Sequence, residues 1–282
     1  MAVRPKSMKR WVVRTLVVGL VLLGIVAEKS ASDRDAALAM PISNNPGDQG
    51  SFTELRGDWF SVPNTAKHEY EPSQVTRELS TKHMDIDGAL PRFWYEFVPE
   101  TDGEMPLVIL FHGAGRDGLS QIEMWKDVAV RQGFALLAPN SVGSSWSLDN
   151  PSPQFIVQLI AEMASMHKID MNRIFLFGHS DGAAYALFLL NHSQGPWRAA
   201  ALHAGYVPLK SLNPPQIAKP YRLYIGEREQ IFSIDEAKQI GKSLAGHGYE
   251  SELVVIPLHD HWFYDIGPQI AEDAWKWFQS HS

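Results

Sequence analysis

The sequence predicts an α/β protein with a largely parallel central sheet and helices on both of its faces. Short apolar segments alternate with amphipathic segments from residue 92 to the end of the chain, a pattern that produces right-handed crossovers between parallel strands. The 282 residues are 45% hydrophobic and 20% charged, which provides a sizeable core and excludes disorder throughout. Glycine- and histidine-containing loops follow several strands, where ligands bind in such sheets.

The first half of the predicted sheet is defined by apolar runs and their breakers. We expect strands at residues 92–98, ended by Pro99, at 106–111 and at 134–138. The second of these strands is apolar throughout, as expected for a buried parallel strand, and it leads into a glycine-rich loop at 112–115. Residues 120–132 between them have apolar side chains at helical spacing.

The second half continues the alternation. Ser152 and Pro153 are typical of a helix start, and further helices are expected at 183–190, 233–245 and 265–278. Strands are expected at residues 173–177, 198–203, 221–225 and 251–256. The glycines at 246 and 248 mark the end of the helix at 233–245.

The N-terminal segment has the pattern of an export signal. Residues 1–14 are basic and residues 15–27 are continuously apolar, although this run is shorter than the roughly 20 residues of a membrane span. We therefore expect residues 1–39 to be a signal peptide, cleaved near residue 39 or residue 27, or else an uncleaved N-terminal membrane anchor. We therefore expect export to the periplasm or the extracellular space, with attachment to the membrane as the alternative. Residues 40–74 are expected to be a loosely structured lead-in, and residues 75–282 the catalytic domain.

Charge and cysteine content exclude several classes of function. Residues 40–282 carry 18 Lys and Arg against 29 Asp and Glu, a net charge of −11, which argues against non-specific binding of nucleic acid. The chain has no cysteine, so disulfides, thiolate metal sites and a cysteine nucleophile are excluded. The oligomeric state is left open.

Residues 178–182 form the sequence Gly-His-Ser-Asp-Gly, which places Ser180 between a predicted strand and a predicted helix. A sharp strand-to-helix turn exposes the hydroxyl of such a serine, and the flanking glycines leave room for neighbouring backbone. The helix N-terminus favours negative charge that develops nearby. We expect Ser180 to be a nucleophile, with the backbone N–H groups of Asp181 and Ala114 as the donors of an oxyanion hole.

A serine nucleophile needs an imidazole base and a carboxylate that orients the imidazole. His259 and His261 lie in the loop after the last predicted strand, and we favour His261 as the base. The alternative for these two histidines is a metal pair, for which no third ligand cluster is evident. We expect no metal site.

The carboxylate should follow a strand between the serine and the histidine. The strand at 221–225 is followed by Glu227 and Glu229, and Asp235 begins the next helix. We favour Glu229 as the acid, while Glu227 and Asp235 stay open as alternatives.

The order Ser180, Glu229, His261, with the strand-to-turn context and the loop at His112 and Gly113, resembles the α/β-hydrolase superfamily. Within it, the chain is similar to esterases related to poly(3-hydroxybutyrate) depolymerases and feruloyl esterases. Those enzymes usually have Asp as the acid. The resemblance covers roughly residues 75–280 and implies an α/β-hydrolase fold with Trp146 near the cleft. His112 lies near the end of a predicted strand, and we expect Trp146 and His112 to bind the substrate.

These features predict a serine esterase that acts on short-chain or aryl esters, because no long lid insertion separates residues 204 and 221. The ester is a small molecule or is derived from a polymer, and no cofactor is expected. The alternatives are a serine peptidase or amidase that uses the same three residues, and a non-catalytic binding module on this fold.

Overall fold

The computed structural model describes residues 50–64, 69–85, 90–148, 152–213 and 218–282. The signal peptide or anchor expected at residues 1–39 lies outside these ranges. Within them, no helix combines the length and the apolar character needed to cross a lipid bilayer.

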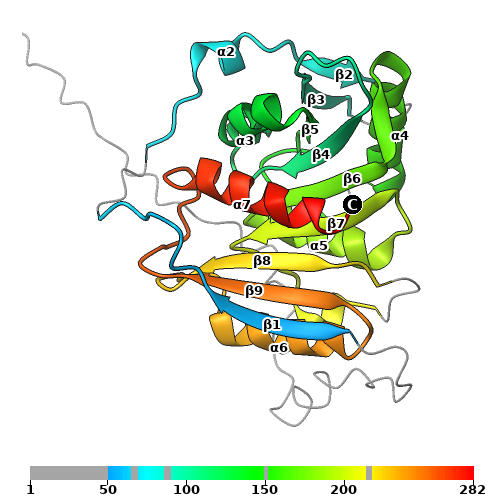
Figure 1. The fold of residues 1–282 in the computed structure, drawn as a ribbon. Helices are drawn as coiled ribbons and strands as arrows, with labels where there is room; N and C mark the ends of the chain where they lie inside the picture. Colours follow the sequence, from blue (N-terminus) through cyan, green and yellow to red (C-terminus); the bar gives the residue numbers. More distant parts are fainter. Residues whose placement is uncertain (1–49, 65–68, 86–89, 149–151, 214–217) are drawn as a thin grey trace, which may run out of the picture. The chain divides into compact units, whose positions relative to one another are not determined.

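Strands of the described residues form one nine-stranded sheet in the order β1-β9-β8-β7-β6-β4-β5-β3-β2 (Figure 1). Neighbouring strands are parallel from β1 to β5, whereas the pairs β3–β5 and β2–β3 are antiparallel. The strands are β1 (Ser51–Arg56), β2 (Lys82–Met84), β3 (Arg92–Phe97), β4 (Met105–Phe111), β5 (Ala135–Pro139), β6 (Ile169–His179), β7 (Trp197–His203), β8 (Tyr221–Gly226) and β9 (Glu250–Ile256). This architecture confirms the predicted fold class.

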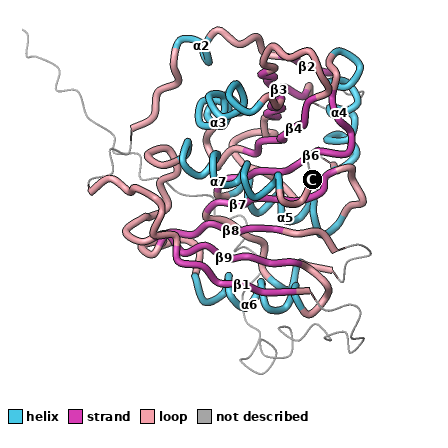
Figure 2. Tube along the Cα trace, in the orientation of Figure 1, coloured by secondary structure: helices cyan, strands magenta, loops and turns pink. Residues whose placement is uncertain are grey.

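Helices cover both faces of the sheet, as the coloured tube in Figure 2 shows. The helices are α2 (Gln74–Arg77), α3 (Gly118–Gln132), α4 (Pro153–Met166), α5 (Asp181–His192), α6 (Ile234–Ala245) and α7 (Gly267–Gln279), with a short 3₁₀ helix, η2, at Leu209–Ser211. Side chains of α4, α5 and α6 pack in one core, and side chains of α3 and α7 pack in a second core.

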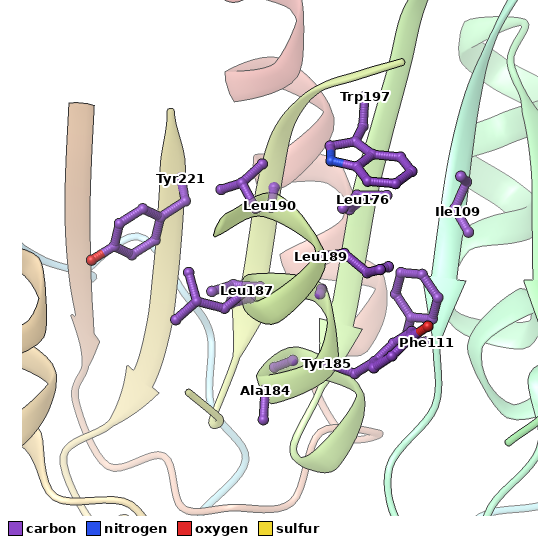
Figure 3. Close-up of a cluster of buried hydrophobic side chains, with 14 of the residues drawn as sticks. Ile109, Phe111, Leu176, Ala184, Tyr185, Leu187, Leu189, Leu190, Trp197 and Tyr221 are labelled. Carbon is purple, nitrogen blue, oxygen red and sulfur yellow. The ribbon is translucent and has the colours of Figure 1, made fainter. Parts of the chain in front are cut away.

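The central strand β4 contributes to both cores because its side chains alternate between the faces of the sheet. Leu107 and Ile109 belong to the core under α4, α5 and α6, whereas Val108 and Leu110 belong to the core under α3 and α7. Every residue of β4 is buried, which explains its uninterrupted apolar sequence. Figure 3 shows the first core, with apolar side chains of α5 packed beside those of the strands.

The N-terminal part of the described chain differs from our expectation. Residues 40–74 were expected to be a loosely structured lead-in, yet residues 51–56 form β1, which pairs in parallel with β9. This edge strand is mostly exposed, and its sequence lacks the apolar alternation that identifies a half-buried strand. The sheet therefore begins before residue 75, and the short β2 and α2 also lie outside the predicted elements.

Candidate active site

Ser180 lies in the tight turn between β6 and α5. Its backbone has φ 55° and ψ −118°, a conformation that costs a non-glycine residue on the order of 1–3 kcal/mol. Its N–H donates to the carbonyl of His203 on the neighbouring strand, at 2.8 Å. A Cβ atom on Gly178 would collide with the carbonyl of Gly182, and one on Gly182 would collide with the carbonyl of Phe111, so both glycines are needed for the close approach of these segments.

Ser180, His261 and Glu229 are joined by hydrogen bonds. The Nε2 atom of His261 lies 2.9 Å from the Oγ of Ser180, and its Nδ1 atom lies 2.8 Å from a carboxylate oxygen of Glu229. The three side chains come from three separate loops at the carboxyl ends of β6, β8 and β9. The structure thus brings together the three residues that the sequence suggested.

The Glu229 carboxylate is completely buried, with 0% of its side chain exposed, whereas the His261 side chain is 26% exposed. The Glu229 oxygen that faces away from His261 accepts hydrogen bonds from the backbone N–H groups of Gln230 at 3.0 Å and Ile231 at 2.7 Å. Burial raises the pKa of Glu229. The hydrogen bonds from His261 and from backbone N–H groups lower this pKa by more, so the net shift is downward.

An ionised Glu229 accepts a hydrogen bond from the Nδ1–H of His261. The Nε2 atom of His261 is then left without a proton, and it can accept the proton of Ser180. The arrangement is therefore competent for general-base activation of a serine hydroxyl.

The two alternative acids lie elsewhere. Glu227 is exposed and pairs with Arg56 at 3.2 Å, and one of its oxygens accepts from the N–H of Leu258. Asp235 is exposed in the first turn of α6. Neither carboxylate is hydrogen bonded to His261, so the geometry favours Glu229.

The two backbone groups expected to bind an oxyanion belong to segments that meet at Ser180. Asp181 is the first residue of α5, and its N–H therefore has no acceptor one turn earlier in that helix. Ala114 is exposed in the loop that follows β4. That loop approaches the turn at Ser180 closely, because a Cβ on Gly113 would lie 2.9 Å from the ring of His179 and 3.5 Å from the Cβ of Ser180.

The side chain of Asp181 holds the loop that follows β5. Its carboxylate accepts hydrogen bonds from the hydroxyl of Ser145 and the backbone N–H of Trp146, both at 2.5 Å. The indole of Trp146 donates to the carbonyl of His112 at 2.8 Å, and His112 Nε2 accepts from the N–H of Ser141 at 3.0 Å. These contacts tie the loop at 141–146 to both loops that surround Ser180.

The prediction that Trp146 and His112 contact the substrate needs correction. Trp146 is only 6% exposed and His112 only 1%. Trp146 stacks on Tyr185 with ring centroids 4.8 Å apart and meets Phe111 edge-on at 5.2 Å. Both side chains are buried and hydrogen bonded to loop backbone, so they hold the loops around Ser180 in place.

A chain of buried histidines lies beside the site, and sequence reasoning did not identify it. His179 Nδ1 lies 2.9 Å from His203 Nδ1, and His203 Nε2 lies 2.9 Å from His259 Nε2. His259, the alternative base, is 2% exposed and contacts His203. The ring of His179 lies 5.3 Å from that of His261, between centroids.

Burial is the largest cause that lowers the pKa of each histidine in this chain. For His259 the pKa falls to about 4, and for His179 and His203 it falls well below the ordinary value of a histidine. All three rings are therefore neutral near pH 7. Each neutral ring has one donor and one acceptor nitrogen, so the tautomer of His203 fixes those of its two neighbours. The sequence signal was the position of each histidine at the carboxyl end of a strand.

A metal-binding group or a surface hollow in the described residues would be a further candidate site. No group of three or more His, Cys, Asp or Glu side chains there is arranged to hold a metal ion, and His259 and His261 bind different partners. Two surface hollows contain none of the three residues joined at the site; one is lined by Trp59, Phe60, Pro268 and Gln269, among others, and the second by Trp197, Arg198 and Lys219, among others.

Comparison with known proteins places this geometry in context. No protein-family model matches the chain. A Bacillus subtilis (strain 168) protein named as a hydrolase, MhqD, is 26% identical over 125 residues, which cover 43% of this chain and 58% of that protein. A thermostable esterase superposes with a TM-score of 0.59 and 19% identity, over 74% of this chain and 64% of that one. An acylaminoacyl peptidase from Pyrococcus horikoshii gives a TM-score of 0.57 and 13% identity, over 72% and 42%.

The chain thus spans less than two thirds of the length of each of these three proteins. The identities to the solved structures are low, and the likeness to them is one of architecture. The shared architecture is the mostly parallel sheet with helices on its faces. The chain has the α/β-hydrolase fold, an architecture that it shares with both esterases and peptidases.

Proposed function

We propose that this protein is a serine hydrolase that cleaves carboxylic esters through an acyl-enzyme. The observation that carries the proposal is the continuous hydrogen-bonded chain from Ser180 Oγ through His261 to the buried Glu229. This chain begins at a serine held with a positive φ at the N-terminus of a helix. Similarity to a thermostable esterase in fold supports the assignment.

In the first half of the reaction, Ser180 Oγ attacks the carbonyl carbon of the ester while His261 Nε2 takes the hydroxyl proton. The backbone N–H groups of Ala114 and Asp181 donate to the oxyanion that forms. The bond to the leaving oxygen then breaks, and His261 returns the proton to the alcohol. In the second half, water attacks the acyl group by the same route and releases the acid. The scheme uses no cofactor.

The proposed substrate class rests on the length of the segment between β7 and β8. The segment between β7 and β8 is short, and in its described part it contains only the 3₁₀ helix η2. We therefore place short-chain and aryl esters ahead of long-chain lipids. The resemblance to poly(3-hydroxybutyrate) depolymerases and feruloyl esterases adds hydroxyacid and hydroxycinnamate esters to the panel of candidates.

Hydrolysis of p-nitrophenyl butyrate by the full chain tests this function, with Ser180→Ala as the matched variant. Turnover by the wild type and its loss in the variant support the proposal. Hydrolysis of p-nitroanilides in preference to esters would instead favour an amidase, and activity that survives in Ser180→Ala would contradict the proposed nucleophile. A clear preference for long acyl chains would contradict the proposed substrate class.

We also propose that the protein is exported, on the strength of the basic residues 1–14 followed by the apolar residues 15–27. Fractionation of cells that express the full chain tests this. Protein in the periplasm, in the medium or on the outer side of the membrane supports export, and a chain found only in the cytoplasm contradicts it.

A further inference from the structure

Arg116 lies at the end of the loop that approaches Ser180, and its guanidinium is held against aromatic rings. The N–H of Arg116 donates to the carbonyl of Gly113 at 3.1 Å, which closes a tight turn. The guanidinium carbon lies 5.4 Å from the ring centre of Tyr70, 5.6 Å from that of Trp262 and 5.1 Å from that of Tyr264. Tyr70 and Tyr264 stack with centroids 4.5 Å apart. Contacts with three rings limit the orientations of an otherwise exposed side chain.

Two carboxylates close to this arginine or to its aromatic partners in the sequence accept hydrogen bonds from backbone N–H groups. Asp117 caps α3 by accepting from the N–H of Ser120 at 3.2 Å, and Asp260 accepts from the N–H of Trp262 at 2.8 Å. Within the ranges that the structure describes, the guanidinium of Arg116 makes no ion pair and no hydrogen bond. Its five N–H donors are therefore available to a ligand.

Three observations place this cation at the rim of the proposed active site. Trp262 directly follows His261 in the sequence, and its ring lies under the guanidinium. Gly113 lies beside Ser180, and its carbonyl accepts the backbone hydrogen bond from Arg116. Burial is the main cause of the lowered pKa of His179, and the positive charge of Arg116 lowers that pKa further.

We propose that Arg116 is a specificity-determining residue and that the ester substrate carries a carboxylate, which the guanidinium binds. The planar fork of an arginine matches a carboxylate in two parallel hydrogen bonds, and three aromatic faces hold it in place before the ligand arrives. The chain as a whole has a net charge of −7 and repels anions, so an oriented cation on the loop that approaches Ser180 would attract an anionic substrate locally. This inference rests on the proposed esterase function.

The test compares pairs of esters that differ in one carboxylate, at pH 7 and after subtraction of the uncatalysed rate. One pair places the charge on the acyl group: mono-p-nitrophenyl glutarate against p-nitrophenyl valerate. The second pair places it on the alcohol: 4-acetoxybenzoate against its methyl ester. For each pair, kcat/KM is measured with the wild type, Arg116→Gln and Arg116→Lys.

For the anionic member of at least one pair, we expect Arg116→Gln to lower kcat/KM about tenfold, chiefly through KM, which is a modest value for a charge-assisted hydrogen bond at a partly solvated site. For the neutral member, we expect a change of less than about twofold. Arg116→Lys keeps the charge and loses the fork, so its loss on the anionic ester is intermediate.

Arg131→Gln is the matched control, because it removes the same charge from an exposed arginine at the far end of α3, where it pairs with Glu272. An equal effect of the two glutamine variants, or no effect of either on the anionic-to-neutral ratio, overturns the inference while the neutral esters still report an active esterase. Failure of the wild type to hydrolyse any of these esters contradicts the proposed function, and with it the inference.

Discussion

Replacement of Glu229 by glutamine is the most informative perturbation of the proposed site, since it changes the charge of the side chain with little change of shape. One oxygen of Glu229 accepts from backbone N–H groups, and the other accepts from Nδ1 of His261. In Glu229→Gln, the amide oxygen keeps the backbone bonds, so the amide nitrogen is turned toward His261. That nitrogen is a donor, and it selects the tautomer of His261 with its proton on Nε2.

A histidine with its proton on Nε2 has no lone pair to offer Ser180. The variant therefore loses general-base catalysis while the fold and the hydrogen bonds around residue 229 are kept. In serine proteases, a wrong tautomer of the catalytic histidine lowers kcat about 10⁴-fold, so we expect a decrease of about 10³- to 10⁴-fold here. This corresponds to about 4–5.5 kcal/mol of transition-state stabilisation, at 1.36 kcal/mol for each factor of ten.

The assay is steady-state hydrolysis of p-nitrophenyl butyrate, with circular dichroism and thermal unfolding as checks on folding. Glu227→Gln is the matched control, because Glu227 lies two residues away, is exposed and pairs with Arg56 on the surface. We expect that control to stay within about twofold of the wild type. A Glu229→Gln enzyme that retains more than a tenth of the wild-type kcat would contradict a role of the Glu229 charge in orienting His261, as would an equal loss in Glu227→Gln.

Three further predictions concern the surroundings of the site. His203→Phe leaves the facing nitrogens of His179 and His259 without a partner, so the free energy of unfolding in urea should fall by roughly 2–6 kcal/mol, and a change of less than 1 kcal/mol would contradict the hydrogen-bonded chain. Because the pKa of His259 is about 4 in the folded protein and near 6.5 when unfolded, the unfolded chain binds more protons between these values. Stability should therefore decrease as the pH falls from about 6.5 to 4, by about 3 kcal/mol from this residue, and a stability independent of pH in that window would speak against its burial as a neutral ring. Asp181→Asn removes the charge that holds the N–H of Trp146 and the hydroxyl of Ser145 but keeps the backbone N–H of residue 181. The free energy of unfolding should fall by about 1–3 kcal/mol, while kcat falls less than tenfold. A loss of activity like that of Glu229→Gln would contradict this separation of roles.

The predicted elements that the structure reproduces are those with a strong local pattern. The strand predicted at 106–111 is β4, which starts one residue earlier, and the helix predicted at 233–245 is α6, which begins after the N-cap Ser233. Continuous apolar runs and capping residues depend on the burial and backbone of a few neighbouring residues. For the same reason, the order of serine, acid and histidine at successive strand ends sufficed to find Ser180, Glu229 and His261, whose roles stay predictions until activity is measured.

The features that sequence reasoning missed depend on tertiary contacts. The edge strand β1 is exposed and has no apolar alternation, because its place is set by pairing with β9, nearly 200 residues later. Trp146 is buried by contacts with Tyr185 and Phe111, which lie on separate elements. The sequence places this aromatic residue near the site but does not indicate these contacts. The pattern of a single loop does not indicate which face of that loop the fold will cover.

The contacts between the buried histidines also depend on tertiary structure and were not predictable from the sequence. His203 and His259 both follow or end strands, as expected for residues near the site, but only the pairing of β7 with β8 and the path of the loop after β9 bring their rings together. The sequence placed His259 second to His261 as the base. The structure separates them, because His259 is buried against His203 and His261 reaches Ser180.

In the proposed mechanism, Ser180 carries the acyl group during ester hydrolysis. Rapid mixing of the full chain with p-nitrophenyl butyrate, acid quenching within the first turnover and peptide mass spectrometry measure this directly. We expect one butyryl group on the peptide that contains Ser180, formed as p-nitrophenol is released and absent from Ser180→Ala. A butyryl group on another residue, or ester hydrolysis with no acylated peptide and undiminished in Ser180→Ala, would contradict it.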